Sequence, residues 1–126
     1  MKDIQFVDFE TLESMISEDF GEWSKPVIID QKMIDLFAEL TGDHQWIHLD
    51  SERCKSESPF GTTIAHGFLT ASLMPKAFGE VIAPNEKVAS MINYGIDKLR
   101  FLEPVKSGDA VKYTFTLSET VEKPQG

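Results

Sequence analysis

Residues 40–69, LTGDHQWIHLDSERCKSESPFGTTIAHGFL, concentrate side chains that can bind, donate or accept protons. The candidates in this stretch are Asp43, Gln45, His48, Asp50 and His66. Segments with helical patterns of apolar residues precede and follow it, so two packed helices would hold these polar groups in place. We therefore expect the stretch to form a functional site.

The segment before this stretch predicts an amphipathic helix that starts at Gln31. Its apolar residues recur three and four positions apart, which is the period of a helix face. Asp30 is a suitable N-cap, and Gly42 provides a left-handed stop. Asp43 should therefore lie immediately beyond the end of a helix, where a simple turn role is the alternative to a catalytic one.

The segment after it, residues 66–82 (HGFLTASLMPKAFGEVI), predicts a helix that is apolar on nearly every face and hence buried. Its first turn holds His66 and Gly67, where free N–H groups and the positive end of the helix dipole favour a developing oxyanion. Gly67 also lacks a Cβ that would keep a substrate away. Pro75 cannot donate to the carbonyl of Ala71, so we expect a kink or an irregular turn there.

The other segments predict two short helices and four strands. A lead-in helix is expected between Phe6 and Ile16, with Asp8 as its N-cap, and Asp50 should cap a short helix that runs through Lys55. The strands are expected over residues 26–29, 88–96, 98–105 and 110–121, the last two joined by the turn KSGD. One domain over residues 1–126 is the expected organisation.

The amino-acid composition excludes some classes of binding partner and some cellular locations. Acidic residues outnumber basic ones by 21 to 12, so binding to nucleic acid or to an anionic membrane is not expected. The single Cys54 allows no internal disulfide and is expected to be a buried, inert thiol. No apolar run is long enough for a membrane span, and the first twenty residues do not have the pattern of a signal peptide. We therefore expect a cytoplasmic protein.

Two motifs point to a family. The patterns TGDxxxIHxD at residues 41–50 and FGxTIAHGFLT at residues 60–70 resemble the MaoC-like, R-specific enoyl-CoA hydratases. Residues 92–109, INYGIDKLRFLEPVKSGD, are similar to the nodulation protein N-like branch. This resemblance implies an α+β hotdog fold, in which an antiparallel sheet wraps around a long central helix, and a homodimer. We expect the family's usual C-terminal strands to be lacking, which would leave an open sheet edge after Val121 unless a partner strand covers it.

The resemblance also implies a reaction. Such enzymes add water to a trans-2-enoyl-CoA to form the (R)-3-hydroxyacyl-CoA, or catalyse the reverse dehydration, with no metal or organic cofactor. The catalytic dyad carries over onto Asp43 and His48, and the Gly67 N–H onto the donor for the enolate oxygen. A neutral His48 suits the base, and Asp43 would be the acid if burial raised its pKa, although the two roles can be exchanged.

Four further residues are candidates for substrate binding: Gln45, His66, Lys98 and Arg100. Gln45 would orient the dyad loop through its amide, and His66 would contact the substrate or simply bond to that loop. Lys98 and Arg100 share one face of an expected strand, where they would receive coenzyme A phosphates or form an ordinary solvated surface. His44 and His48 have zinc-like spacing only on a helix, and because we expect a loop we predict no metal.

Two other functions remain open at this point. A hotdog thioesterase would use a carboxylate to attack the thioester carbonyl or to activate water there. A non-catalytic module would bind an acyl thioester without converting it. The carrier of the acyl group is either coenzyme A or acyl carrier protein.

Overall fold

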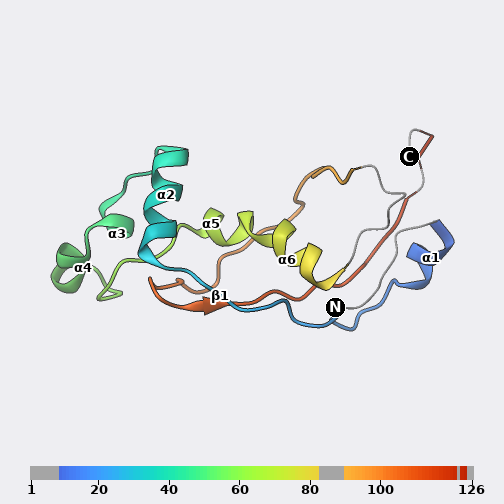
Figure 1. Cartoon of the computed structure of the whole chain (residues 1–126), viewed down its shortest axis with the longest axis horizontal. Coiled ribbons are helices and arrows are strands. Elements are labelled where there is room, and N and C mark those ends of the chain that lie inside the picture. The colour runs from blue at the N-terminus through green and yellow to red at the C-terminus, as the bar shows by residue number, and fades with distance from the viewer. Residues whose placement is uncertain (1–8, 83–89, 122, 125–126) are drawn as a thin grey trace. The chain divides into compact units, whose positions relative to one another are not determined.

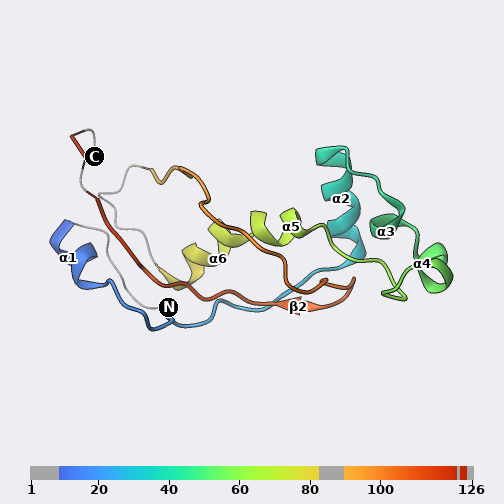
Figure 2. The ribbon, with the colours of Figure 1, turned by 180° about the vertical axis from the view of Figure 1, so that it is seen from behind.

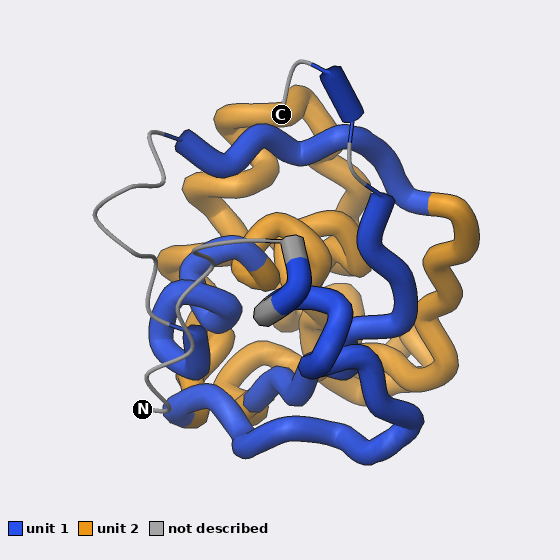
Figure 3. Tube along the Cα trace, turned by 90° about the vertical axis from the view of Figure 1, so that its right-hand side faces the viewer, with its two compact units in different colours: residues 1–25, 75–96, 112–126 blue, residues 26–74, 97–111 orange. Residues whose placement is uncertain are grey.

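The computed structural model describes residues 9–82, 90–121 and 123–124 (Figure 1). The chain divides into two compact units (Figure 3). Unit 1 contains residues 1–25, 75–96 and 112–126, and unit 2 contains residues 26–74 and 97–111. A single domain over residues 1–126 stays a prediction.

The first helix of unit 2, α2 (Gln31–Thr41), has both of the predicted end signals. The Asp30 carboxylate accepts a hydrogen bond from the Met33 N–H at 2.9 Å, which satisfies one of the free donors of the first turn. At the other end Gly42 has a φ of 80°, and its N–H bonds to the Ala38 carbonyl. The side chains of Ile34 and Ala38 face inward and are buried, so the amphipathic pattern is confirmed.

Two short helices follow, α3 (Trp46–Leu49) and α4 (Ser51–Glu57). α3 corrects the sequence prediction of an irregular loop after Gly42, because residues 46–49 form one helical turn. Asp50 caps α4 as predicted, and its Oδ1 accepts from the Arg53 N–H at 3.0 Å. The Cys54 side chain is fully buried, and its Sγ lies 3.7 Å from the Ile47 carbonyl oxygen, so α4 packs against α3.

The predicted long helix over residues 66–82 is divided in two. α5 (Gly67–Ser72) belongs to unit 2, and α6 (Met74–Val81) lies almost entirely in unit 1. The interruption at Leu73 agrees with the irregularity expected near Pro75, because Pro75 then lies in the first turn of α6, where no N–H is required. The expectation of burial on every face is wrong, since the Phe68 side chain is 66% exposed.

The sheet of unit 2 pairs β1 (Val27–Ile28) with β2 (Ala110–Val111) in antiparallel register; Figure 2 labels β2. Val27 lies opposite Val111 and Ile28 opposite Ala110. The predicted turn before β2 is present, with Gly108 at a φ of 96° and its N–H bonded to the Ile29 carbonyl. An isolated antiparallel bridge joins Ile64 to Lys106.

Two of the predicted strands do not form over the described residues. Residues 90–96 and 98–105 carry no strand, and residues 88–89 of the first prediction lie outside the described part. Some of their apolar side chains are left exposed, Ile92 at 85% and Leu102 at 86%, whereas Phe101 contacts Phe68 and Val105 packs against the core. β-branched and aromatic residues favour strands only where a neighbouring strand and a packed face are available.

The core of unit 2 lies between α2, α5 and the sheet. Its buried members are Ile29, Ile34, Ala65 and Leu69. Partly buried apolar side chains surround them, among them Val27, Phe37, Val105 and Val111. The core therefore packs Ile29 and Ile34, which precede the stretch 40–69, against Ala65 and Leu69 at its C-terminal end.

Unit 1 contains α1 (Phe9–Ser14) and two extended segments that bond to each other. Residues 17, 21 and 24 donate to the carbonyls of residues 117, 115 and 113. The first segment advances seven positions while the second advances four, so no regular ladder forms and the predicted strand over 110–121 is reduced to β2. α1 starts where the lead-in helix was expected, and its proposed cap, Asp8, lies outside the described residues.

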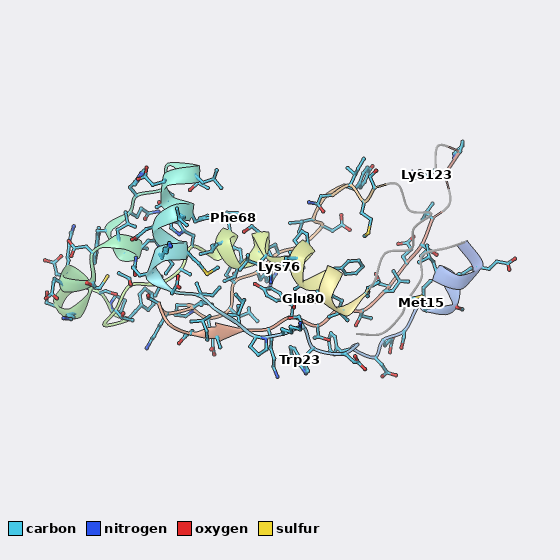
Figure 4. All side chains as sticks on the ribbon, viewed as in Figure 1. Met15, Trp23, Phe68, Lys76, Glu80 and Lys123 are labelled. Carbon is cyan, nitrogen blue, oxygen red and sulfur yellow. The ribbon has the colours of Figure 1, made fainter. Side chains whose placement is uncertain are left out.

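The α6 helix of unit 1 carries two labelled side chains in Figure 4, Lys76 and Glu80. Their Nζ and Oε1 atoms lie 2.7 Å apart, and the Lys25 N–H donates to the other oxygen of Glu80. These bonds lower the pKa of Glu80, with the Lys76 bond as the largest cause. Within the described chain, no helix combines the length and the apolar character that crossing a membrane requires.

The N-cap of α2 gives a test of the fold. Replacing Asp30 by Ala removes the acceptor for the Met33 N–H and should lower the free energy of unfolding by about 1 kcal/mol. Asp30→Asn keeps an oxygen acceptor and is the matched control, expected within a few tenths of wild type. Urea denaturation measures both, and equal stability of the Ala and Asn variants would contradict the capping role.

Candidate active site

The site residues of the stretch 40–69 all belong to unit 2. Asp43 follows the left-handed Gly42, and Gln45 is the residue before α3. His48 lies in the single turn of α3, and His66 immediately precedes α5. The core packing of α2 and α5 therefore brings residues from the two ends of the stretch together.

His48 is the best-held polar side chain of the site. It is 6% exposed, and its Nδ1 lies 2.7 Å from the carbonyl oxygen of Ile64. Because a carbonyl can only accept, Nδ1 carries the proton and the neutral ring has its lone pair on Nε2. That Nε2 lies 3.8 Å from Oδ2 of Asp43. The predicted pair of carboxylate and imidazole thus meets, although Asp43 lies in the turn after α2 and His48 lies in α3.

Three residues that the sequence did not reveal hold His48. Gln31 donates from Nε2 to the His48 carbonyl at 2.8 Å, and buried Thr63 donates to Gln31 Oε1 at 2.6 Å. The Ile64 N–H also bonds to the Ile47 carbonyl at 3.0 Å. Contacts to backbone carbonyls leave no residue pattern in a sequence, so only the structure could find them.

Asp43 has an environment opposite to the one expected for an acid. Its side chain is 40% exposed, and Oδ1 accepts hydrogen bonds from the side-chain amide and the N–H of Gln45, at 3.1 and 3.3 Å. The Gln45 amide is the largest cause of a lowered pKa for Asp43, and His48 and His66 add smaller effects in the same direction. The expected rise in the pKa of Asp43 by burial is therefore wrong, and the carboxylate is ionised at neutral pH.

His66 lies against His48. The two rings stack with centroids 3.7 Å apart and an angle of 23° between their planes. The Nε2 of His66 lies 3.0 Å from the backbone carbonyl oxygen of Asp43. The sequence left two roles open for His66, a substrate contact or a hydrogen bond to the loop. The structure contains the hydrogen bond to the loop.

A cavity of about 300 Å³ opens beside these rings. Its lining includes His48, His66, Gly67 and Thr70, together with residues 101–105. Asp43 does not line the cavity itself and adjoins it through His48. The cavity is therefore bounded by imidazoles, the start of α5 and an apolar segment.

Gly67 has a structural reason to be glycine. A Cβ at this position would lie 2.7 Å from the ring of Phe101, which is closer than side chains tolerate. Phe101 also meets the exposed Phe68, labelled in Figure 4, edge to face at a centroid distance of 5.6 Å. The sequence suggested that Gly67 lets a substrate approach the backbone. The structure gives a second reason for glycine, which is the closeness of the Phe101 ring.

Lys98 and Arg100 do not share a strand face, because residues 98–100 form no strand. Both side chains are exposed, and neither lines the cavity. They lie in the segment that continues into Phe101, so they are close along the chain to its wall. Their role in binding phosphates stays a prediction.

The histidines form no zinc-like pair of the kind considered from spacing. His44 bonds through Nε2 to Glu39 at 2.9 Å, which raises the pKa of His44, whereas His48 bonds to Ile64. Asp43, His48 and His66 do offer one ligand atom each within 4.8 Å of one another. One nitrogen of each of these two rings already bonds to a backbone carbonyl, His48 Nδ1 to Ile64 and His66 Nε2 to Asp43, so each ring has one nitrogen left for a ligand.

Comparison with known proteins identifies relatives over most of the chain. The sequence model of the "MaoC like domain" family matches residues 15–125. "Nodulation protein N" of Rhizobium leguminosarum bv. viciae is 49% identical over 107 residues, covering 84% of this chain and 65% of that protein. "3-hydroxyacyl-thioester dehydratase Z" of Mycobacterium tuberculosis is 48% identical over 91 residues, covering 72% and 59%. This chain thus spans about two thirds or less of these two relatives.

A solved structure gives the same picture. R-hydratase PhaJ1 from Pseudomonas aeruginosa aligns with a TM-score of 0.64 and 29% identity, over 82% of this chain and 63% of that one. The expected α+β hotdog fold is confirmed by this likeness.

The contact between Gln45 and Asp43 predicts a measurable shift. Gln45→Met keeps the size of the side chain but removes the amide that favours the charged carboxylate, so the pKa of Asp43 should rise toward its ordinary value. Carbon NMR of the labelled Asp43 carboxyl group follows the titration. Gln45→Glu is not a suitable control because it adds charge, whereas Asn93→Leu removes an exposed amide of unit 1 and should leave the titration of Asp43 unchanged. An unchanged Asp43 titration in Gln45→Met would contradict the assignment.

Proposed function

Because this chain belongs to the MaoC-like domain family, we propose that it is an R-specific enoyl-CoA hydratase, which adds water to a trans-2-enoyl thioester or removes it in the reverse reaction. Its relatives are named as dehydratases and hydratases, so the family is one of hydro-lyases. The observation that carries the proposal is the distance of 3.8 Å between His48 Nε2 and Asp43 Oδ2 beside a cavity. The proposal includes a cytoplasmic homodimer and no metal or organic cofactor.

The two facing atoms suit a bound water. Nε2 of neutral His48 and Oδ2 of ionised Asp43 are both acceptors, so direct contact between them would be unfavourable. A water molecule donates one hydrogen to each and leaves its oxygen lone pairs free to attack C3 of the enoyl group. Asp43 is ionised at neutral pH, and the Gln45 amide lowers its pKa further below the ordinary value.

The proton then follows a short path. As the water oxygen bonds to C3, His48 takes one proton at Nε2, and the Asp43 carboxylate stabilises the imidazolium. The electrons of the double bond move onto the thioester oxygen, and His48 returns the proton to C2. Hydroxide on C3 and a proton on C2 together account for one water. Hence we assign His48 as both base and acid, and Asp43 as the residue that holds the water and balances the charge.

Gly67 supplies the proposed donor for the enolate oxygen. Its N–H belongs to the first turn of α5, where no intrahelical acceptor is available, and the residue lines the cavity. A donor that is already oriented toward developing charge contributes on the order of 100- to 1000-fold in rate.

The dyad predicts the outcome of a direct assay. Asp43→Asn and His48→Ala should each lower the rate of crotonyl-CoA hydration by on the order of 100-fold or more, because the first removes the negative charge that stabilises the imidazolium and the second removes the base. His44→Ala, in the same loop but bonded to Glu39, is the matched control and should keep the wild-type rate. The loss of enoyl absorbance measures hydration.

A thiol reagent in the same assay separates the other functions. Loss of absorbance without thiol release means hydration, whereas thiol release means a thioesterase. Binding of crotonyl-CoA without either change means an acyl-thioester module and contradicts the proposed activity. Near-wild-type rates in both dyad variants would contradict the residue assignment.

Lys98 and Arg100 are proposed to bind the phosphates of coenzyme A. The chain carries a net charge of −9, so a local pair of exposed cations would offset repulsion of the substrate. Replacing both by Ala should raise KM for a CoA thioester with little change in kcat. Lys32→Ala combined with Lys55→Ala removes the same charge elsewhere and should leave KM nearly unchanged. Equal losses in kcat and kcat/KM, or equal effects of the two pairs, would refute this role.

A further inference from the structure

His66 connects the two members of the dyad. Its Nε2 donates to the Asp43 backbone carbonyl at 3.0 Å, since a carbonyl can only accept. Its ring stacks on that of His48 at a centroid distance of 3.7 Å, and Phe37 contacts it at 5.0 Å. The residue is 4% exposed. One buried ring thus touches the backbone of Asp43 and the imidazole of His48 together.

The Asp43 loop needs such a connection. The Asp43 side chain is 40% exposed, and the bond from its N–H to Thr41 Oγ1 is long, at 3.4 Å. The Gln45 contacts join Asp43 only to a neighbour within the same loop. The bond from His66 instead ties the loop to residues at the start of α5, whose Leu69 is part of the core.

The environment of His66 Nδ1 shows that a histidine at this position has a cost in stability. Nδ1 is buried and has no hydrogen-bond partner among the described residues. With the proton on Nε2, this atom is an acceptor removed from water without compensation. A phenyl ring would stack on His48 without that cost but could not donate to Asp43. The contact that distinguishes histidine here is therefore the one made by Nε2.

We propose that His66 is a positioning residue for the hydration reaction: its Nε2–H bond to the Asp43 carbonyl, with its stack on His48, fixes the separation of the carboxylate and the imidazole. The proposal rests on the hydratase function proposed above. It assigns His66 no contact with the reacting atoms. An error of about 1 Å in the placement of reacting groups can cost on the order of 100-fold in rate.

Three substitutions separate the contacts of His66. Gln carries its amide nitrogen about as far from the backbone as Nε2 and can still donate to the Asp43 carbonyl. Asn carries its amide at the distance of Nδ1 and cannot reach that carbonyl. Phe keeps the stacked ring and loses both nitrogens. Thermal unfolding of each variant establishes that it is folded at the assay temperature.

The expected result is a split between kcat and KM. His66→Asn and His66→Phe should lower kcat for crotonyl-CoA hydration by about 10- to 100-fold, with KM changed by less than about threefold. His66→Gln should keep kcat within about threefold of wild type. This rescue by an amide at the Nε2 position is a result that loss of stability alone would not give.

The opposite pattern would overturn the inference. If His66→Asn is active, and His66→Gln raises KM, then Nδ1 serves the substrate and His66 is a binding residue. Equal kcat in His66→Phe and wild type, or equal loss in Gln and Asn variants, also contradicts the positioning role. Failure of the wild-type chain to hydrate crotonyl-CoA would instead refute the proposed function, so the two failures are distinguishable.

Discussion

The hydrogen bond from His48 Nδ1 to the Ile64 carbonyl, at 2.7 Å, is the contact on which the site depends. It fixes the tautomer of a buried imidazole and therefore decides that Nε2 faces Asp43 with a lone pair. The Ile64 carbonyl is held in place because the N–H of Ile64 bonds to the Ile47 carbonyl and because Ile64 forms a bridge with Lys106. A backbone held on both sides thus orients the side chain that the proposed chemistry requires.

The His48 imidazole and the Asp43 carboxylate have different environments. His48 is buried and stacked, whereas Asp43 is partly exposed and bonded to an amide. An ionised carboxylate beside an imidazole of fixed tautomer is suited to holding a water between two acceptors. A buried carboxylic acid, which the sequence alone favoured, would instead have been suited to donating a proton. The same Asp and His pair can therefore take different acid and base roles, and the solvent exposure of the carboxylate decides which role Asp43 takes.

Much of the local structure could be predicted because its causes are local. Asp30, Gly42 and Asp50 act within one turn of chain, so their caps were read correctly from the sequence. The strands over 98–105 and 110–121 were predicted from composition and alternation, which do not reveal whether a partner segment keeps the same register. In the described residues that register is lost between residues 17–24 and 113–117, and only β2 remains.

The sequence by itself determined the family motif, the helix caps and the candidate pair Asp43 and His48, because these depend on residue type and on short spacings. The tertiary structure alone decided the tautomer of His48, the direction of the pKa shift of Asp43 and the contact of His66 with both. Those properties arise from hydrogen bonds to the backbone carbonyls of Ile64 and Asp43, and from the stacking of rings 18 positions apart in the chain. A carbonyl is present at every position of every sequence, so only the fold can select which one a side chain meets.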